Sequence, residues 1–101
     1  MVKLVALYTK PDDVAGFDKH YREVHTPLVR KMPGLRKLAV SRFTGSPGGE
    51  PRYYMMAEMF FDSRESMTAA LKSEEGKAAG KDIMSLAGQH LHMMFAEVEE
   101  S

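Results

Sequence analysis

The chain has 101 residues, of which 44% are hydrophobic and 28% charged, and its formal net charge at pH 7 is zero. This composition excludes a disordered chain, and it offers neither a basic face for nucleic acid nor an apolar segment long enough to predict a membrane span. The absence of cysteine excludes disulfides, cysteine-zinc sites and thiol nucleophiles, and it favours a cytoplasmic protein, because small secreted domains usually depend on disulfides.

A single domain is predicted over residues 1–101. Residues 2–8 are short and β-rich, and they predict a first strand rather than a signal peptide, because no small-residue cleavage site follows them. A helix is predicted to begin at 11–13, where a proline precedes two acids, and to end at Pro33-Gly34.

Two further strands are predicted over 35–43 and 53–61, and the glycine- and proline-rich segment 45–51 predicts the hairpin loop between them. Three elements follow in the predicted order: a helix capped at 62–63, a second helical piece capped at 73–75 and ended by Gly88, and a last strand over 90–98.

The order βαββαβ predicts an α+β fold of the ferredoxin-like type, in which the helices cover one face of a four-stranded antiparallel sheet. Both faces of these strands are apolar, whereas a sheet with one face in water should alternate apolar with polar residues. Strand 53–61 divides into two sets, with Tyr53, Met55, Ala57, Met59 and Phe61 on one side and Tyr54, Met56, Glu58 and Phe60 on the other. An exposed apolar face of this size needs a cover, so we predict a homodimer packed sheet against sheet, that is, a dimeric α+β barrel.

The first predicted helix carries two histidines beside one apolar stripe, which consists of Val14, Phe17, Tyr21, Val24 and Leu28. On a regular helix His20 and His25 lie about 70° to either side of the centre of that stripe, and so about 140° apart. They cannot jointly hold one small ion from this helix alone.

Pro27 changes the local expectation for His25. Proline cannot donate to the carbonyl of Glu23 and disfavours helical angles at Thr26, so we expect a kink or break with a restart at Pro27. His25 would then lie at a helix end, where it serves either as a pocket acid or base or as a structural cap. His20 has no breaker or partner near it in the sequence, and a structural role is expected for it.

Glu58 interrupts an otherwise apolar strand, and a buried carboxylate must be paired, hydrogen-bonded or protonated. We expect either an ion pair with Arg42 from the adjacent strand or a pocket acid or base with a raised pKa. Methionines also crowd two strands that we expect in the middle of the sheet: Met55, Met56, Met59, Met93 and Met94. Such a group forms either ordinary core or the lining of an apolar pocket for a flat or flexible ligand.

His90 and His92 leave the same face of a strand and could supply two metal ligands. A third ligand would have to come from Glu58, His25 or a partner subunit, and two ligands alone do not make a site. The alternative is that one histidine lines the mouth of the barrel and the other is solvated, so no metal is expected.

The spaced residues resemble those of the EthD family over essentially the whole chain. The similarity lies in Phe17-x3-Tyr21-x3-His25-x-Pro27-Leu28, in Pro33-Gly34-Leu35, in Ala57-Glu58, in Phe61-Asp62-Ser63 and in Ser73-x2-Gly76-x2-Ala79-x2-Asp82. Leu86 departs from the family, which often has an aromatic residue there. The resemblance implies a dimeric α+β barrel and no metal or nucleotide cofactor. The family is named for a small protein needed alongside a cytochrome monooxygenase system in bacterial ether degradation, and relatives of the barrel include isomerases, cyclases, dehydratases or decarboxylases, and quinone-forming monooxygenases.

Three hypotheses of function follow. The leading one is a cofactor-free enzyme that acts on a small apolar, aromatic or lactone-like compound in an oxidative or degradative pathway. Its expected catalytic residues are His25 and Glu58, and its expected substrate-binding residues are Tyr8, Arg42, Tyr54, Met56 and His92. The second hypothesis is a non-catalytic accessory or carrier protein that supports a monooxygenase system. The third is a haem- or metal-linked monooxygenase of the same fold.

Overall fold

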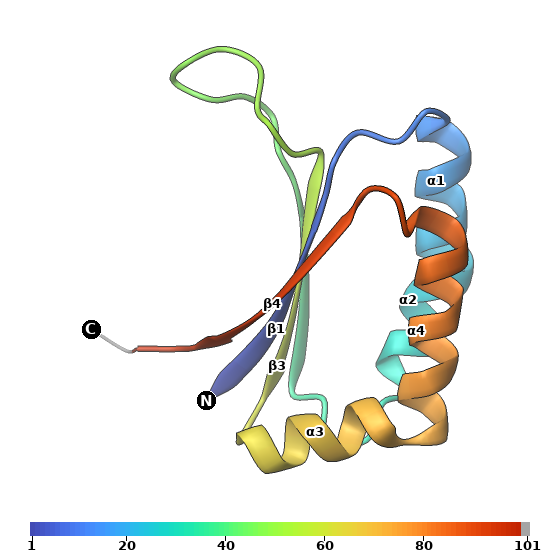
Figure 1. The fold of residues 1–101 in the computed structure, drawn as a ribbon, viewed down its shortest axis with the longest axis vertical. Coiled ribbons are helices and arrows are strands. Elements are labelled where there is room, and N and C mark those ends of the chain that lie inside the picture. Colours follow the sequence, from blue (N-terminus) through green and yellow to red (C-terminus); the bar gives the residue numbers. More distant parts are fainter. Residues whose placement is uncertain (100–101) are drawn as a thin grey trace.

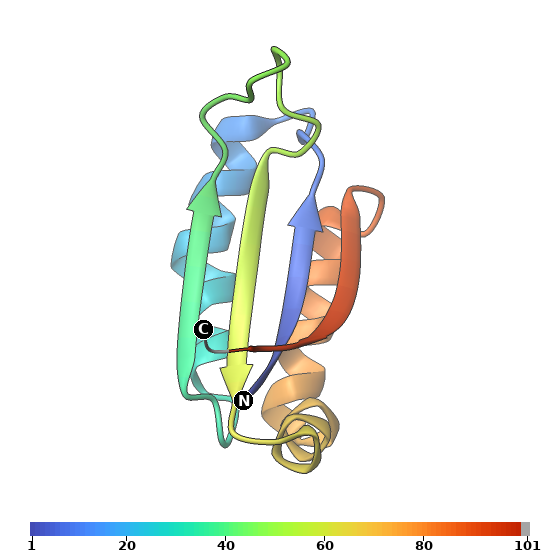
Figure 2. The same ribbon diagram turned by 90° about the vertical axis from the view of Figure 1, so that its left-hand side faces the viewer.

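The computed structural model describes residues 1–99, which form a four-stranded antiparallel sheet with all helices on one face (Figure 1). The elements are, in chain order, β1 (Val2–Tyr8), α1 (Val14–His20), the π-helix η1 (Tyr21–His25), α2 (Thr26–Arg30), β2 (Lys37–Arg42), β3 (Met55–Phe61), α3 (Arg64–Lys72), α4 (Glu74–Ala87) and β4 (Leu91–Glu97). The strands lie side by side in the order β2-β3-β1-β4 (Figure 2), and this arrangement confirms the predicted ferredoxin-like α+β fold. The expectation that β4 lies in the middle of the sheet was wrong, because it forms one edge.

Short polar side chains fix where the helices begin. The carboxylate of Asp13 accepts a hydrogen bond from the backbone N–H of Gly16 at 3.0 Å and so caps α1. Ser63 and Ser66 form a reciprocal capping box at the start of α3, and Ser73 caps α4. These caps confirm the predicted starts of the last two helices.

The core lies between the helices and one face of the sheet. Alternate residues of the two central strands are buried on that face: Val2, Leu4, Ala6 and Tyr8 of β1, and Met55, Ala57, Met59 and Phe61 of β3. The strict alternation places the other residues of both strands on the opposite face, which no helix covers (Figure 1). We call this second surface the open face.

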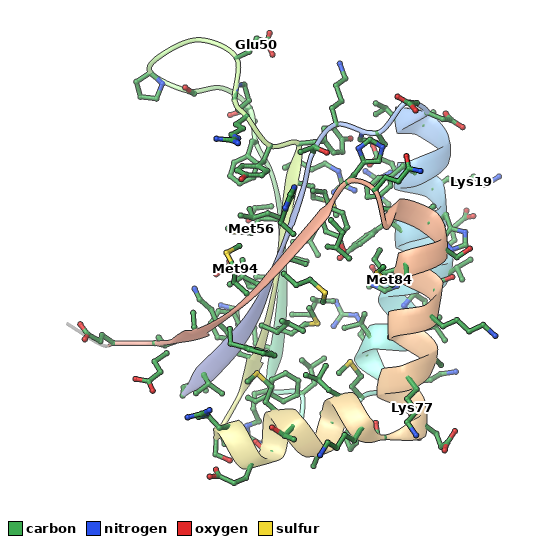
Figure 3. All side chains as sticks on the ribbon, in the orientation of Figure 1. Lys19, Glu50, Met56, Lys77, Met84 and Met94 are labelled. Atoms are coloured by element: carbon green, nitrogen blue, oxygen red, sulfur yellow. The ribbon has the colours of Figure 1, made fainter. Side chains whose placement is uncertain are left out.

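The open face is largely apolar, as the sequence predicts, and it also carries the ion pair between Lys3 and Glu58. The register places Val5, Leu7, Met56, Phe60, Met94 and Ala96 on it. Figure 3 shows Met56 and Met94 on the side of the sheet that points away from the helices. The edge strand β4 curves away from the helices toward its C-terminal end (Figure 1). Two consecutive residues of this strand, Met93 and Met94, lie on opposite sides of it and are 48% and 46% exposed. Within residues 1–99, no helix has the length and apolarity that a membrane crossing requires.

Candidate functional site

The first helical segment contains a wide turn at the point where Pro27 lacks an N–H group. The backbone N–H of Thr26 donates to the carbonyl of Tyr21, five residues earlier, which is the hydrogen bond of a π-helix. Thr26 itself is helical, at φ −56° and ψ −45°. The expected break at Pro27 was therefore wrong in form. The wide turn accommodates the lack of an N–H group at Pro27, and the chain continues as α2.

This wide turn changes which residues face the core. The buried positions run Phe17, Tyr21, His25 and Val29, at intervals of four residues. Val24 was expected in the apolar stripe, but it is exposed. His25 takes the inward position because the π-helix adds one residue to the turn and shifts the helix phase after it.

His25 and His20 share one carboxylate. Nδ1 of His25 lies 3.1 Å from Oδ2 of Asp82, and Nε2 of His20 lies 2.8 Å from Oδ1 of the same residue, which belongs to α4. The side chain of His25 is only 5% exposed, that of Asp82 17% and that of His20 37%. The partner of His20 lies 62 residues away in the sequence, where the local pattern gave no sign of it, and the two histidines converge on a carboxylate and not on an ion.

Burial and Asp82 act on the pKa of His25 in opposite directions. Burial disfavours the imidazolium and lowers the pKa, the hydrogen bond and the charge of Asp82 raise it, and the net pKa is lowered. His25 is therefore neutral at pH 7, with one ring nitrogen held by Asp82. If Nδ1 donates to the carboxylate, Nε2 is left as a proton acceptor.

Two buried tyrosines lie against His25. Its ring is 5.0 Å from that of Tyr21, and the rings of Tyr21 and Tyr8 are 5.9 Å apart in an edge-to-face arrangement. Burial raises the pKa of Tyr21 to about 12 and also raises the pKa of Tyr8, so both hydroxyls keep their protons at pH 7. The cluster combines a neutral base with phenolic donors.

His25 and Tyr8 line a cavity of about 50 Å³ between the helices and the sheet. Its other walls are apolar side chains and helix backbone: Leu4, Ala6, Val29, Met32, Met59, Leu71, Gly76, Ala79, Gly80, Ile83 and Met93. A drug-sized ligand occupies roughly 300 Å³ or more. The cavity therefore has the chemistry of an apolar ligand site, and it reaches that size only if its flexible walls move.

Arg42 and Tyr54 form a separate polar cluster with Asp18 of α1. The hydroxyl of Tyr54 donates to Asp18 Oδ2 at 2.7 Å, and Nη2 of Arg42 lies 3.2 Å from Oδ1. Tyr54 precedes β3 and contacts Phe17 on the helix side, so its expected place on the same side as Met56 was wrong. The alternation of sides begins only at Met55, where the strand begins.

The remaining predicted residues lie on the open face. Glu58 pairs with Lys3 at 2.7 Å, so the expected ion pair between Glu58 and Arg42 was wrong. Met56 and His92 share this face with Glu58, and the ring of His92 packs edge-on against Tyr53 at 6.1 Å. The sheet thus separates all three residues from His25.

His90 and His92 do not form a metal pair. His90 precedes β4, and its Nδ1 lies 2.9 Å from the hydroxyl of Thr9. Among residues 1–99, no group of three or more potential side-chain ligands is arranged to hold a metal ion.

The sequence reasoning gave no role to two members of the site, Asp82 and Tyr21. The helical spacing of α4 carries a usable signal for Asp82, because this acid lies at the edge of the face that buries Gly76, Ala79 and Ile83. Tyr21 was assigned to the apolar stripe, and its contact with His25 follows from their spacing of four residues, which places two side chains on the same face of a helix.

Comparison with known proteins gives a family match over most of the chain. Residues 12–90 match the model of the EthD domain. An ethyl tert-butyl ether d (ethd) family protein from Bacillus halodurans, solved by crystallography, is 50% identical, with 98% of this chain and 99% of that chain covered and a TM-score of 0.95. An uncharacterized 11.0 kDa protein in the thcB-thcC intergenic region of Rhodococcus erythropolis is 31% identical over 99 residues, which are 98% of this chain and 96% of that protein.

More distant structures share the fold alone. SnoaB from Streptomyces nogalater, described as a cofactor-independent oxygenase, is 12% identical, with 99% of this chain and 94% of that chain covered and a TM-score of 0.73. A dimeric protein of ferredoxin-like fold from Bacteroides fragilis is 22% identical, with 96% and 95% covered and a TM-score of 0.67.

Proposed function

Because the chain belongs to the EthD family and places a buried His25–Asp82 pair beside an apolar cavity, we propose that it is an enzyme that uses acid-base chemistry. Its substrate is a small apolar, aromatic or lactone-like compound, and the reaction needs no bound cofactor. The observation that carries the proposal is the 3.1 Å contact between Nδ1 of His25 and Oδ2 of Asp82 at the cavity wall.

In the proposed mechanism His25 removes or returns a proton, and Asp82 orients it. The carboxylate accepts the Nδ1–H of His25, which fixes the tautomer and leaves Nε2 to receive a proton from the substrate. Asp82 then stabilises the imidazolium that forms. Tyr8, which keeps its proton at pH 7, is placed to donate a hydrogen bond to an oxygen of the substrate.

The other expected site residues take different roles in this proposal. Arg42 and Tyr54, which contact Asp18, form a polar rim for the substrate at the far end of the helix-facing core. Glu58, Met56 and His92 belong to the open face and act at the contact with a second copy. The fold relative described as a cofactor-independent oxygenase supports an oxidative version of this chemistry. The similarity to an ethyl tert-butyl ether d (ethd) family protein supports a place in a degradative pathway such as ether degradation.

We also propose that the working form is a homodimer in the cytoplasm. The apolar open face supports a second copy packed sheet against sheet, and solved proteins with this fold are described as dimeric. The absence of cysteine supports the location.

A second candidate function is a carrier or accessory protein for a monooxygenase system. The small volume of the cavity, about 50 Å³, favours it, because a protein that only holds a compound can open on binding without arranging groups for chemistry.

The test begins with ligand-observed NMR on a panel of small aromatic ethers, hydroxyquinones and enol lactones. Compounds that bind are then incubated with the wild type and with His25→Gln, Asp82→Asn and His90→Gln variants. We expect His25→Gln to lower kcat by about 10²–10⁴-fold, the usual contribution of a positioned acid or base, while His90→Gln, which lies outside the cavity, leaves kcat unchanged. Equal turnover by wild type and His25→Gln would remove His25 from the mechanism, and binding without turnover would favour the carrier.

A further inference from the structure

We propose that His20 is a positioning residue that sets the proton affinity of His25 through the carboxylate of Asp82. This inference rests on the proposed function, because it gives His20 a role in the acid-base site. The coupling itself can be measured without any substrate.

The three side chains connect two different environments across the helical layer. His25 lines the enclosed apolar cavity, whereas His20 lines an open groove of about 630 Å³ between the start of α1 and the turn that follows α4. Side-chain exposure rises from 5% at His25 through 17% at Asp82 to 37% at His20. A solvent-accessible imidazole is thus linked to a buried one by two short contacts, of 2.8 Å and 3.1 Å, to a single carboxylate.

Sharing one carboxylate couples the two titrations. When His20 is neutral, the full negative charge of Asp82 is available to stabilise a proton on His25. When His20 is protonated, its positive charge offsets Asp82 and repels a second positive charge on His25, so the pKa of His25 is lowered further. Acidification of the groove therefore keeps the buried imidazole neutral and able to act as a base.

The other ionisable groups around the pair do not provide this link. Tyr8 and Tyr21 face His25 from β1 and η1, and burial keeps their hydroxyls protonated. The groove around His20 also contains Asp12, Asp13 and His90. Asp13 caps the backbone N–H of Gly16, and His90 contacts the hydroxyl of Thr9, so neither bridges to His25.

The test follows the imidazole NMR signals of His25 during a pH titration of the wild type and of His20→Gln, Asp82→Asn and His92→Gln variants. Glutamine can still donate an N–H to Asp82, but it carries no charge. We expect the wild-type signal of His25 to move in two steps, because it senses His20. In His20→Gln the curve becomes a single step with a midpoint higher by on the order of one pH unit. Asp82→Asn lowers the midpoint, and His92→Gln leaves the wild-type curve unchanged.

A superposition of the His20→Gln and wild-type curves would overturn the proposal and leave His20 as a structural support of Asp82. A second measurement does not depend on that variant: in the wild type, one of the two steps of the His25 signal must coincide with the change of the His20 signal, and a wild-type His25 signal that moves in a single step would also overturn the proposal. Coupling without turnover of any compound would refute the proposed enzyme alone, whereas turnover without coupling would refute the role of His20 alone.

Discussion

His25 is a buried titratable group, and its protonation is therefore linked to folding. Burial lowers its pKa in the folded state below the usual value of about 6.5 that it has in the unfolded chain. Between the folded and unfolded pKa values, the unfolded chain binds more protons than the folded protein. The free energy of unfolding therefore rises with pH across this window. The contribution of neutral His25 to stability is fully present above about pH 6.5, and it is lost as the pH falls through the folded pKa.

The His25→Gln variant tests this linkage between protonation and folding, because it removes the titrating group but keeps a polar side chain. We expect the wild type to lose stability as the pH falls from about 7.5 to 5.5. The loss should be smaller in His25→Gln, because its glutamine does not have to gain a proton. Urea unfolding at a series of pH values measures the difference, with His92→Gln as the control. Equal pH dependence in the wild type and His25→Gln would show that protonation of His25 is not linked to folding.

At the scale of single elements, β4 supplies an exposed wall of the cavity. Met93 lines the cavity with His25, and it is also 48% exposed, so its flexible side chain lies between the cavity and solvent. The helix α4 lines the same cavity with the small residues Gly76, Ala79 and Gly80. We infer that ligands reach His25 between α4 and β4 by displacing this methionine.

Met93→Ala tests this access route, with Met94→Ala as a matched control on the opposite side of the same strand. Shortening Met93 enlarges the apolar cavity beyond its present volume of about 50 Å³ and toward the roughly 150 Å³ at which an apolar cavity can hold benzene, so we expect benzene to bind about tenfold more tightly in an NMR titration. Met94→Ala should bind benzene as the wild type does. Each substitution should reduce the free energy of unfolding by about 1 kcal/mol, since each side chain is half exposed. Benzene affinity unchanged by Met93→Ala would place the route elsewhere.

The elements themselves were largely predictable from the sequence, and the site was predictable only in part. The alternation of side chains identified the buried side of β1, and Ser63 and Ser73 identified the first residues of two helices. Both signals depend only on residues that are close together in the sequence. His25 was also found, from its place next to Pro27. The sequence did not predict that His25 faces the core in place of Val24. A period of 3.6 residues assumes a uniform helix, and the wide turn interrupts that period. The contact with Asp82, which lies 57 residues later, depends on how two helices pack.

At the scale of the whole molecule, the proposed homodimer makes a prediction about the open face. Met94 lies on this face and is half exposed, whereas Met84 belongs to α4, which lies on the other side of the sheet (Figure 3), and is 59% exposed. A charge at Met94 would be buried without a partner in the proposed dimer, and a charge at Met84 would remain in solvent.

Sedimentation equilibrium of Met94→Glu and Met84→Glu measures this difference. We expect the wild type and Met84→Glu to be dimers, and Met94→Glu to dissociate with a Kd at least about 100-fold higher. A monomeric wild type would contradict the homodimer. A dimer that tolerates Met94→Glu would show that copies associate through another surface.

The wide turn at Tyr21–His25 has a consequence for how the site is inherited. A helix with one π turn carries one residue more than a uniform α-helix between the same two ends, so it can arise from a single-residue insertion and vanish by a single-residue deletion. Deleting the exposed Val24 would restore a regular hydrogen-bond ladder and leave the histidine three residues after Tyr21, which is the place that a uniform helix gives to the apolar stripe. The imidazole would then still face inward. A uniform helix of the present length would instead turn Val24 inward and His25 away from the core. Proteins that differ by one residue in this segment can therefore share the inward histidine, whereas proteins of equal length that lack the wide turn cannot.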